Sequence, residues 1–90
     1  MPLFFESCFR THYTPEGNFV NARITVTTTT GKTQLTSVDG RPVENTLEHH
    51  MEAVYRYMKK KGAKEVEKYH IHIGKLKDDF YFIVDDWTRD

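Results

Sequence analysis

One segment in the middle of the chain repeats its apolar residues at helical spacing, and the segments on either side of it do not. The apolar face occupies positions i, i+4, i+7 and i+11, which are Leu47, Met51, Val54 and Met58. Asn45 and Glu48 have the spacing of a capping box, and Gly62 suits the position after the last turn. Because a single amphipathic helix can cover only one face of a sheet, this segment limits the architectures that the chain can adopt.

The flanking segments alternate apolar and polar residues with a period of two, which is typical of half-buried strands. Three lie before the helix, in residues 3–13, 18–30 and 32–38, and two lie after it, in residues 69–73 and 80–84. The loop "SVDGRPVE" leads into the helix. This order predicts an α+β fold in which residues 1–90 form a single domain. We expect a five-stranded antiparallel sheet, connected β-β-β-α-β-β, with one helix packed on one face.

The triplet "GKT" at 31–33 contains the residues that end a phosphate-binding P-loop. A P-loop also needs a glycine five positions before its Gly-Lys pair and a helix directly after it, whereas position 26 is Val. Glycine readily takes the positive φ of a tight turn, so the triplet instead predicts a hairpin centred on 30–31. That hairpin places Leu35 opposite Val26.

Charge and cysteine content argue against several classes of function. Thirteen Lys and Arg balance thirteen Asp and Glu, so no overall field draws the chain onto nucleic acid or an anionic membrane. No apolar run approaches the roughly 18 residues of a membrane-spanning helix. The single cysteine, Cys8, has no partner for an internal disulfide, and the start "MPLFFESCF" lacks the pattern of a secretory signal. We therefore expect a cytoplasmic protein that needs neither a cofactor nor a membrane.

The histidines offer a metal-binding alternative. His70 and His72 alternate onto one strand face, where both rings could reach one ion in a zinc protein or a metal-dependent hydrolase. Cys8 and His12 share a face of the first strand, but four residues of strand put about 13 Å between their Cα atoms. Since the chain has no Cys-x-x-Cys or His-Glu-x-x-His pattern, we favour a partly solvated sheet face for these histidines.

Nucleic-acid binding is a second alternative. A cationic patch at the end of the helix comprises Lys59, Lys60, Lys61 and Lys64. The aromatic residues 80–82 could stack on bases, but alternation divides them between two faces, and acidic pairs flank them at 78–79 and 85–86. We expect the first acidic pair to form a hairpin turn and the second to end a strand. Because lysines at a helix end also favour the helix dipole, we do not favour nucleic acid as the partner.

The sheet face opposite the helix is the favoured binding surface. Its predicted contacts are four apolar or aromatic residues and one cation: Phe4, Tyr81, Ile83, Trp87 and Arg23. An apolar patch rimmed by charge, on a chain this short, is typical of a contact surface for another protein. The sequence therefore predicts a small non-enzymatic accessory or inhibitor module that binds a protein partner, with self-association as a related possibility.

Overall fold

The computed structural model describes residues 8–28, 31–63, 65 and 69–84. Several residues that the sequence analysis singles out lie outside these ranges: Phe4, Lys64, Asp85, Asp86 and Trp87. Within the described ranges, no helix is long and apolar enough to cross a membrane.

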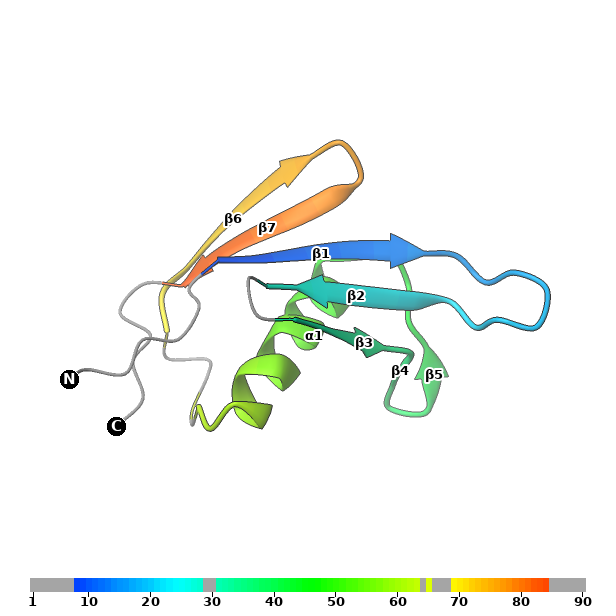
Figure 1. The fold of residues 1–90 in the computed structure, drawn as a ribbon, viewed down its shortest axis with the longest axis horizontal. Helices are drawn as coiled ribbons and strands as arrows, with labels where there is room; N and C mark the ends of the chain where they lie inside the picture. The colour runs from blue at the N-terminus through cyan, green and yellow to red at the C-terminus, as the bar shows by residue number, and fades with distance from the viewer. Residues whose placement is uncertain (1–7, 29–30, 64, 66–68, 85–90) are drawn as a thin grey trace.

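Five antiparallel strands form one sheet, in the spatial order β3-β2-β1-β7-β6 (Figure 1). The strands are β1 Cys8–Thr14, β2 Arg23–Thr27, β3 Lys32–Leu35, β6 Ile71–Leu76 and β7 Asp79–Val84. The helix α1, Leu47–Lys60, packs against one face of this sheet, mainly on β1 and β2. The predicted α+β fold, with a five-stranded antiparallel sheet and one helix, is confirmed.

β1 lies at the centre of the sheet, since it pairs with β2 on one side and β7 on the other. Its residues Phe9 and Thr11 point toward α1 and are fully buried. The core between helix and sheet consists of Phe9, Ala22, Ile24, Val26, Leu35, Val43, Ala53, Val54, Tyr57, Met58, Phe82 and Val84. Phe9 and Tyr57 meet edge to face, with ring centroids 5.4 Å apart. Burial of these apolar side chains holds the helix on one side of the sheet.

The N-terminus of α1 differs by one residue from the capping-box prediction. Thr46, not Asn45, is the N-cap, and its hydroxyl accepts a hydrogen bond from the His49 N–H at 3.2 Å. Asn45 instead accepts a hydrogen bond from the ring of His50 at 2.9 Å. Asn45 therefore makes a tertiary contact, and Thr46 beside it accepts the hydrogen bond from the N–H group in the first turn of the helix.

The C-terminus of α1 is the one that the sequence predicts. Gly62 has a φ of 105°, in the left-handed region that glycine tolerates best. Its N–H donates to the Lys59 carbonyl at 3.0 Å, and the N–H of Ala63 donates to the Met58 carbonyl at 2.9 Å. These two bonds form a Schellman motif, which satisfies carbonyls that the helix itself leaves without a donor.

The buried face of α1 is rotated relative to the predicted stripe. Val54 and Met58 are buried as predicted and Met51 is half-buried, but Leu47 is exposed. The buried helix residues are His50, Ala53, Val54, Tyr57 and Met58. His50 takes the inward position in the first turn because it faces the hydroxyl of Thr11 on β1, a polar partner that Leu47 could not use.

The register of the β2–β3 hairpin differs by two residues from the prediction. Leu35 lies opposite Ile24, not Val26. Both the N–H and the hydroxyl of Thr28 donate to the Gly31 carbonyl, at 2.8 and 3.0 Å, and these two bonds favour closure at this pair. A shift of two residues keeps each side chain on its predicted face, so the composition of the two sheet faces is unchanged.

A second, small sheet occupies the segment predicted as a loop. β4, Ser37–Val38, pairs with β5, Arg41–Pro42, in a two-stranded hairpin. Asp39 and Gly40 connect them with φ values of 51° and 78°, as a type I′ turn requires. The Asp-Gly pair is the sequence signal for this turn, and the strands were missed because each has only two residues.

Candidate functional site

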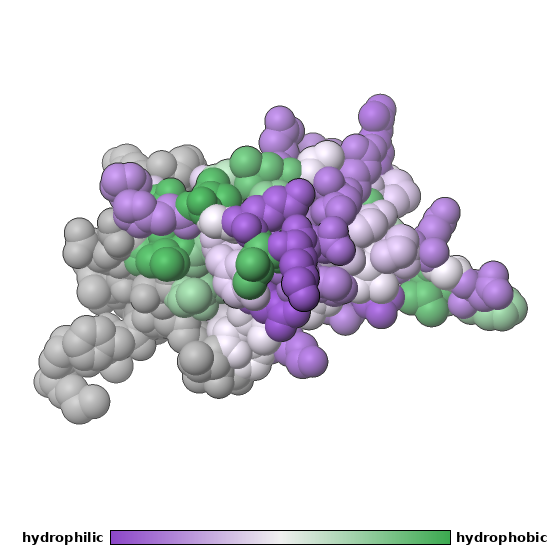
Figure 2. Space-filling model, turned by 90° about the horizontal axis from the view of Figure 1, so that it is seen from above, coloured by the Kyte–Doolittle hydropathy of each residue, from purple (hydrophilic) through white to green (hydrophobic). Residues whose placement is uncertain are grey.

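The sheet face turned away from α1 is formed by alternate residues of all five strands, and we call it the helix-free face. Its described members are Cys8, Arg10, His12, Thr14, Arg23, Thr25, Thr27, Lys32, Gln34, His72, Gly74, Leu76, Asp79, Tyr81 and Ile83. Seen from above the sheet of Figure 1, the molecular surface is largely hydrophilic, with hydrophobic side chains in small separate groups (Figure 2). Polar side chains therefore dominate a surface on which apolar contacts are few and local.

A cluster of three charged or titratable side chains lies near the middle of the helix-free face. The carboxylate of Asp79 accepts hydrogen bonds from Arg10, with Nε at 2.7 Å and Nη2 at 2.6 Å from Oδ2. Its other oxygen, Oδ1, lies 2.5 Å from Nδ1 of His12. Arg10 and His12 are half-exposed, whereas the Asp79 side chain is only 12% exposed. One nearly buried carboxylate thus fixes two side chains that remain open to solvent.

The two partners determine the ionisation of Asp79. Burial alone would raise the pKa of this carboxyl, but hydrogen bonds from His12 and Arg10, together with the Arg10 charge, bring the pKa below its ordinary value. The same contact raises the pKa of the Arg10 guanidinium, through the hydrogen bond to Asp79 and its charge. Asp79 is therefore an anion at neutral pH, and Arg10 is held in a fixed position beside it.

Asp79 fixes the orientation of the His12 ring. An ionised carboxylate can only accept hydrogen bonds, so Nδ1 of His12 carries the proton of this bond. Cys8 lies on the same strand face as His12, two positions beyond Arg10, and is exposed. Across the sheet, Ile83 separates Cys8 from His72, which puts about 10 Å between those two strand positions. The described residues therefore place an oriented imidazole on this face without bringing the cysteine to it.

Beside the cluster is a hollow of about 300 Å³. Its lining comprises Arg10, His12, Leu76, Lys77, Asp78, Asp79 and Tyr81. Tyr81 is the cross-strand neighbour of Arg10, and Leu76 is that of Asp79. An aromatic ring, an exposed leucine and a fixed guanidinium thus surround one depression, a combination that is enriched where proteins bind other proteins.

The charges on the helix-free face are predominantly positive. Among its described members, Arg10, Arg23 and Lys32 are cations, and Asp79 is the carboxylate. The whole chain has a formal net charge of zero, so the positive charge of this face is a local property that composition does not reveal. A surface of this kind attracts an anionic partner.

The structure brings three of the five predicted protein-contact residues onto this face. Tyr81, Ile83 and Arg23 lie there as predicted, while Phe4 and Trp87 lie outside the described residues. Ile83 is 48% exposed and Tyr81 is half-buried.

Of the residues of the two alternative sites, the described lysines lie away from the helix-free face, whereas His72 belongs to it. Lys59, Lys60 and Lys61 are exposed at the end of α1, and Lys64 lies outside the described ranges. The rings of His70 and His72 stack with centroids 4.7 Å apart and planes at 27°. In the part of the chain that the structure describes, no group of three or more His, Cys, Asp or Glu side chains is placed to hold a metal ion.

Asp79 is the site residue that the sequence analysis missed. The acidic pair 78–79 is predicted to form a turn, but the turn comprises Lys77 and Asp78, and Asp79 begins β7. Its partners are 69 and 67 residues away in sequence, so no local pattern could reveal the contact. One sequence signal pointed to this residue: Asp79 directly precedes the alternating apolar run of β7 and lies on the face predicted to be exposed to solvent.

The β1–β2 turn holds a second unexpected feature. Val20 lies in the segment 18–30 that is predicted as a strand, but it is about half-exposed, because β2 begins only at Arg23. Phe19 next to it is fully exposed and has a φ of 67°, which is uncommon for an aromatic residue. The turn extends beyond the rest of the sheet, and hydrophobic atoms mark its end (Figures 1 and 2).

A buried polar network lies directly behind the Arg10–His12 segment. His50 donates from Nε2 to the Asn45 side-chain oxygen at 2.9 Å, so Nδ1 of the neutral ring accepts from the Thr11 hydroxyl at 2.6 Å. The ring also packs on Phe80, with centroids 4.6 Å apart. Burial lowers the pKa of His50 to about 4, which keeps the ring neutral at pH 7. This network ties the first turn of α1 to the strand that carries the exposed cluster.

Comparison of the chain with protein-family models, with curated proteins and with solved structures finds no match.

Proposed function

We propose that this protein is a non-enzymatic binding module that recognises an acidic surface of a partner protein through its helix-free face. The observation that carries the proposal is the fixed guanidinium of Arg10, held by the nearly buried Asp79 beside Tyr81. We expect the module to act in the cytoplasm, where an exposed cysteine such as Cys8 remains reduced.

Two features of the cluster favour tight recognition. Arginine and tyrosine are over-represented among residues that dominate binding energies, and here they are adjacent. The guanidinium is already immobilised by Asp79, so binding loses less side-chain entropy than it would with a mobile arginine. Exposed Ile83 and Leu76 add apolar area on the same face. The partner would therefore present carboxylates to Arg10 and Arg23 and apolar groups to the isoleucine and leucine.

The charge of the face favours a different protein over a second copy of this chain. Two copies that met through this face would bring together two surfaces on each of which the cations Arg10, Arg23 and Lys32 outnumber the carboxylate of Asp79. Like charges placed together across an interface cost free energy. The cations of this face would instead attract the carboxylates of an acidic partner.

Native mass spectrometry of the protein purified from nuclease-treated host lysate tests this proposal. We expect a complex with a different protein chain that weakens as salt is raised. The Arg23→Glu variant should lose most of the complex, whereas Arg41→Glu, an equal change of charge on exposed β5, should keep it. A bare monomer, a homodimer, a complex that nuclease removes, or equal loss in both variants would overturn the proposal.

A further inference from the structure

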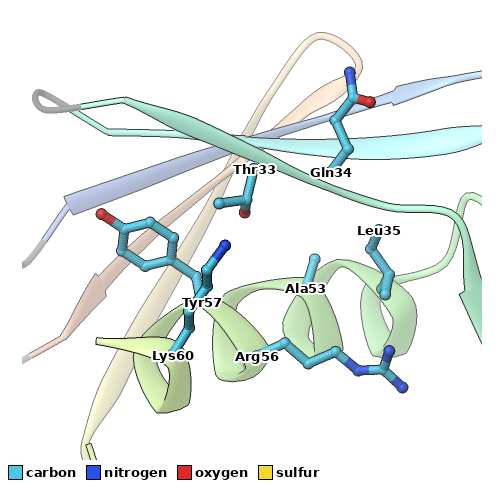
Figure 3. A pocket seen from close by; sticks show the side chains of 7 residues that line it. All are labelled: Thr33, Gln34, Leu35, Ala53, Arg56, Tyr57 and Lys60. Atoms are coloured by element: carbon cyan, nitrogen blue, oxygen red, sulfur yellow. The ribbon is translucent and has the colours of Figure 1, made fainter. Parts of the chain in front are cut away.

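A groove runs between the edge strand β3 and the helix α1. It has a volume of about 170 Å³ and is lined by Thr33, Gln34, Leu35, Ala53, Arg56, Tyr57 and Lys60. Thr33 and Leu35 point from β3 toward the helix, and Ala53, Tyr57 and Lys60 point from the helix toward the strand (Figure 3). The helix residues recur at i, i+3, i+4 and i+7 and so form one continuous wall. We call this feature the β3–α1 groove.

The groove continues into a second hollow at the start of β3. This hollow has a volume of about 240 Å³ and is lined by Gly31, Lys32, Thr33, Tyr57, Lys60 and Lys61. The ammonium of Lys61 lies 5.6 Å from the centroid of the Tyr57 ring. The two hollows share Thr33, Tyr57 and Lys60, so they form one path along the strand.

The path has an apolar floor and a cationic rim. Leu35, Ala53 and Tyr57 are buried and supply the floor. The cations along the path are Lys32, Arg56, Lys60 and Lys61. Among the described residues, Arg56 pairs with the carboxylate of Glu52, which lies 3.3 Å from Arg56 Nε and one helical turn away. The charge along the path is therefore positive, most strongly at the Lys60 end.

β3 lies at the edge of the sheet and can accept another strand. Among the strands that the structure describes, its one neighbour in the sheet is β2. Thr28 and Gly31 form a hydrogen-bonded pair, and such pairs alternate with pairs that exchange no hydrogen bonds along an antiparallel ladder. The N–H and C=O groups of Lys32 and Gln34 therefore point away from β2. An extended segment placed there would pair with these groups, and its alternate side chains would enter the β3–α1 groove.

We propose that the β3–α1 groove binds an extended acidic segment of a partner protein, which adds to the sheet as a strand beside β3. Four residues of β3 span about 13 Å, so a segment of roughly five to seven residues fits. Its carboxylates would lie near Lys32, Lys60 and Lys61, and an apolar side chain would rest on Leu35 and Ala53. This surface lies on the helix side of β3 and shares Lys32 and Gln34 with the helix-free face, and the inference does not depend on the function proposed above.

The opposite edge strand, β6, provides the internal comparison. Like β3 it has one strand neighbour within the described part of the chain, and this neighbour is β7. Within the described residues, α1 packs less closely on β6 than on β1, β2, β3 or β7. Its charged residue Lys75 instead lies over Phe80, with the ammonium 5.5 Å from the ring centroid. The combination of open edge, apolar floor and cationic wall is found at β3.

Selection of random heptapeptides displayed on phage against the full chain tests the inference. We expect the enriched peptides to carry Asp or Glu and to bind the Lys60→Glu variant at least tenfold more weakly. The Lys59→Glu variant, which makes the same charge change one residue away from the groove lining, should bind them within twofold of the wild type. In hydrogen exchange followed by NMR, the bound peptide should protect the amides of Lys32 and Gln34, and not those of β6.

Four results would overturn the inference. These are no enrichment of peptides, enrichment without acidic residues, equal binding to the two lysine variants, and protection of amides on β6. Binding of a dT12 oligonucleotide that depends on Lys60, without enrichment of any acidic peptide, would also overturn it and would identify nucleic acid as the occupant.

Discussion

At the scale of single residues, the centre of the sheet depends on two polar side chains of β1 that point in opposite directions. Thr11 faces inward and donates to His50, and His12 faces outward and bonds to Asp79. Neither contact follows from the alternation that defines β1. That pattern predicts which side of the sheet each residue occupies, but a buried threonine becomes acceptable only because a histidine from the helix meets it.

Replacing Thr11 tests the inward contact. The Thr11→Val variant keeps the shape and strand propensity of the side chain but leaves Nδ1 of His50 buried without a donor, so we expect a loss of about 1–3 kcal/mol in the free energy of unfolding. Thr25→Val makes the same replacement on the helix-free face and should change that free energy by less than about 0.5 kcal/mol. Urea denaturation measures both. Equal effects would show that the Thr11–His50 bond contributes nothing to stability.

The buried histidine also predicts how stability depends on pH. The pKa of His50 is about 4 in the folded protein and 6.5 in its ordinary state. Folding therefore favours the neutral ring, so its contribution to stability is complete above pH 6.5 and is lost as pH falls from 6.5 to about 4. That loss is on the order of 2–3 kcal/mol. The lowered pKa of Asp79 acts in a separate window, below its ordinary value of 3.8.

Urea unfolding of the wild type and His50→Gln between pH 7.5 and 4 isolates this contribution. Both proteins carry the same remaining side chains, so the difference between the two curves belongs to His50. We expect the wild type to lose more stability than the variant over this range. Parallel curves would mean that the ring is protonated in the folded protein without cost.

At the scale of elements, the helix and the five strands could be predicted because each follows a helical or a two-residue period, whereas their ends and registers depend on particular contacts. The N-cap of α1 is Thr46 and not the predicted Asn45, because the side chain of Asn45 bonds to His50. The β2–β3 register differs by two residues from the prediction, because Thr28 pairs with Gly31 at the end of the hairpin. The C-terminus of α1 was predictable, since the left-handed φ of Gly62 is a local requirement.

Alanine substitutions at Gly62 and Gly31 test whether the C-terminus of α1 requires a residue with a left-handed φ. The Gly62→Ala variant forces a side chain into a φ of 105°, so we expect the free energy of unfolding to fall by about 1 kcal/mol. Gly31 does not have a positive φ, and a Cβ there would have no atom within 4 Å, so Gly31→Ala should be close to neutral. Thermal or urea unfolding distinguishes the two variants. A harmless Gly62→Ala change would contradict the role assigned to the helix C-cap.

At the scale of the whole molecule, strand order decides which residues make up the candidate site. The alternation in each strand places Tyr81, Ile83 and Arg23 on one face, and that much could be predicted. Only the central position of β1, between β2 and β7, brings Arg10 and His12 against Asp79. No sequence period encodes this neighbour relation, because it is set by packing of the last hairpin beside the first strand. The positive charge of the helix-free face follows from the same arrangement.

Two isoleucines on neighbouring strands permit the most direct test of the claim that the helix-free face binds the partner. Ile83 on β7 and Ile73 on β6 are 48% and 43% exposed, but they lie on opposite faces of the sheet. We would measure the affinity of the captured partner for Ile83→Ser and Ile73→Ser. We predict that Ile83→Ser weakens binding about tenfold, or roughly 1.4 kcal/mol, while Ile73→Ser stays within twofold of the wild type. Weakening by Ile73→Ser alone, or by neither variant, would contradict it.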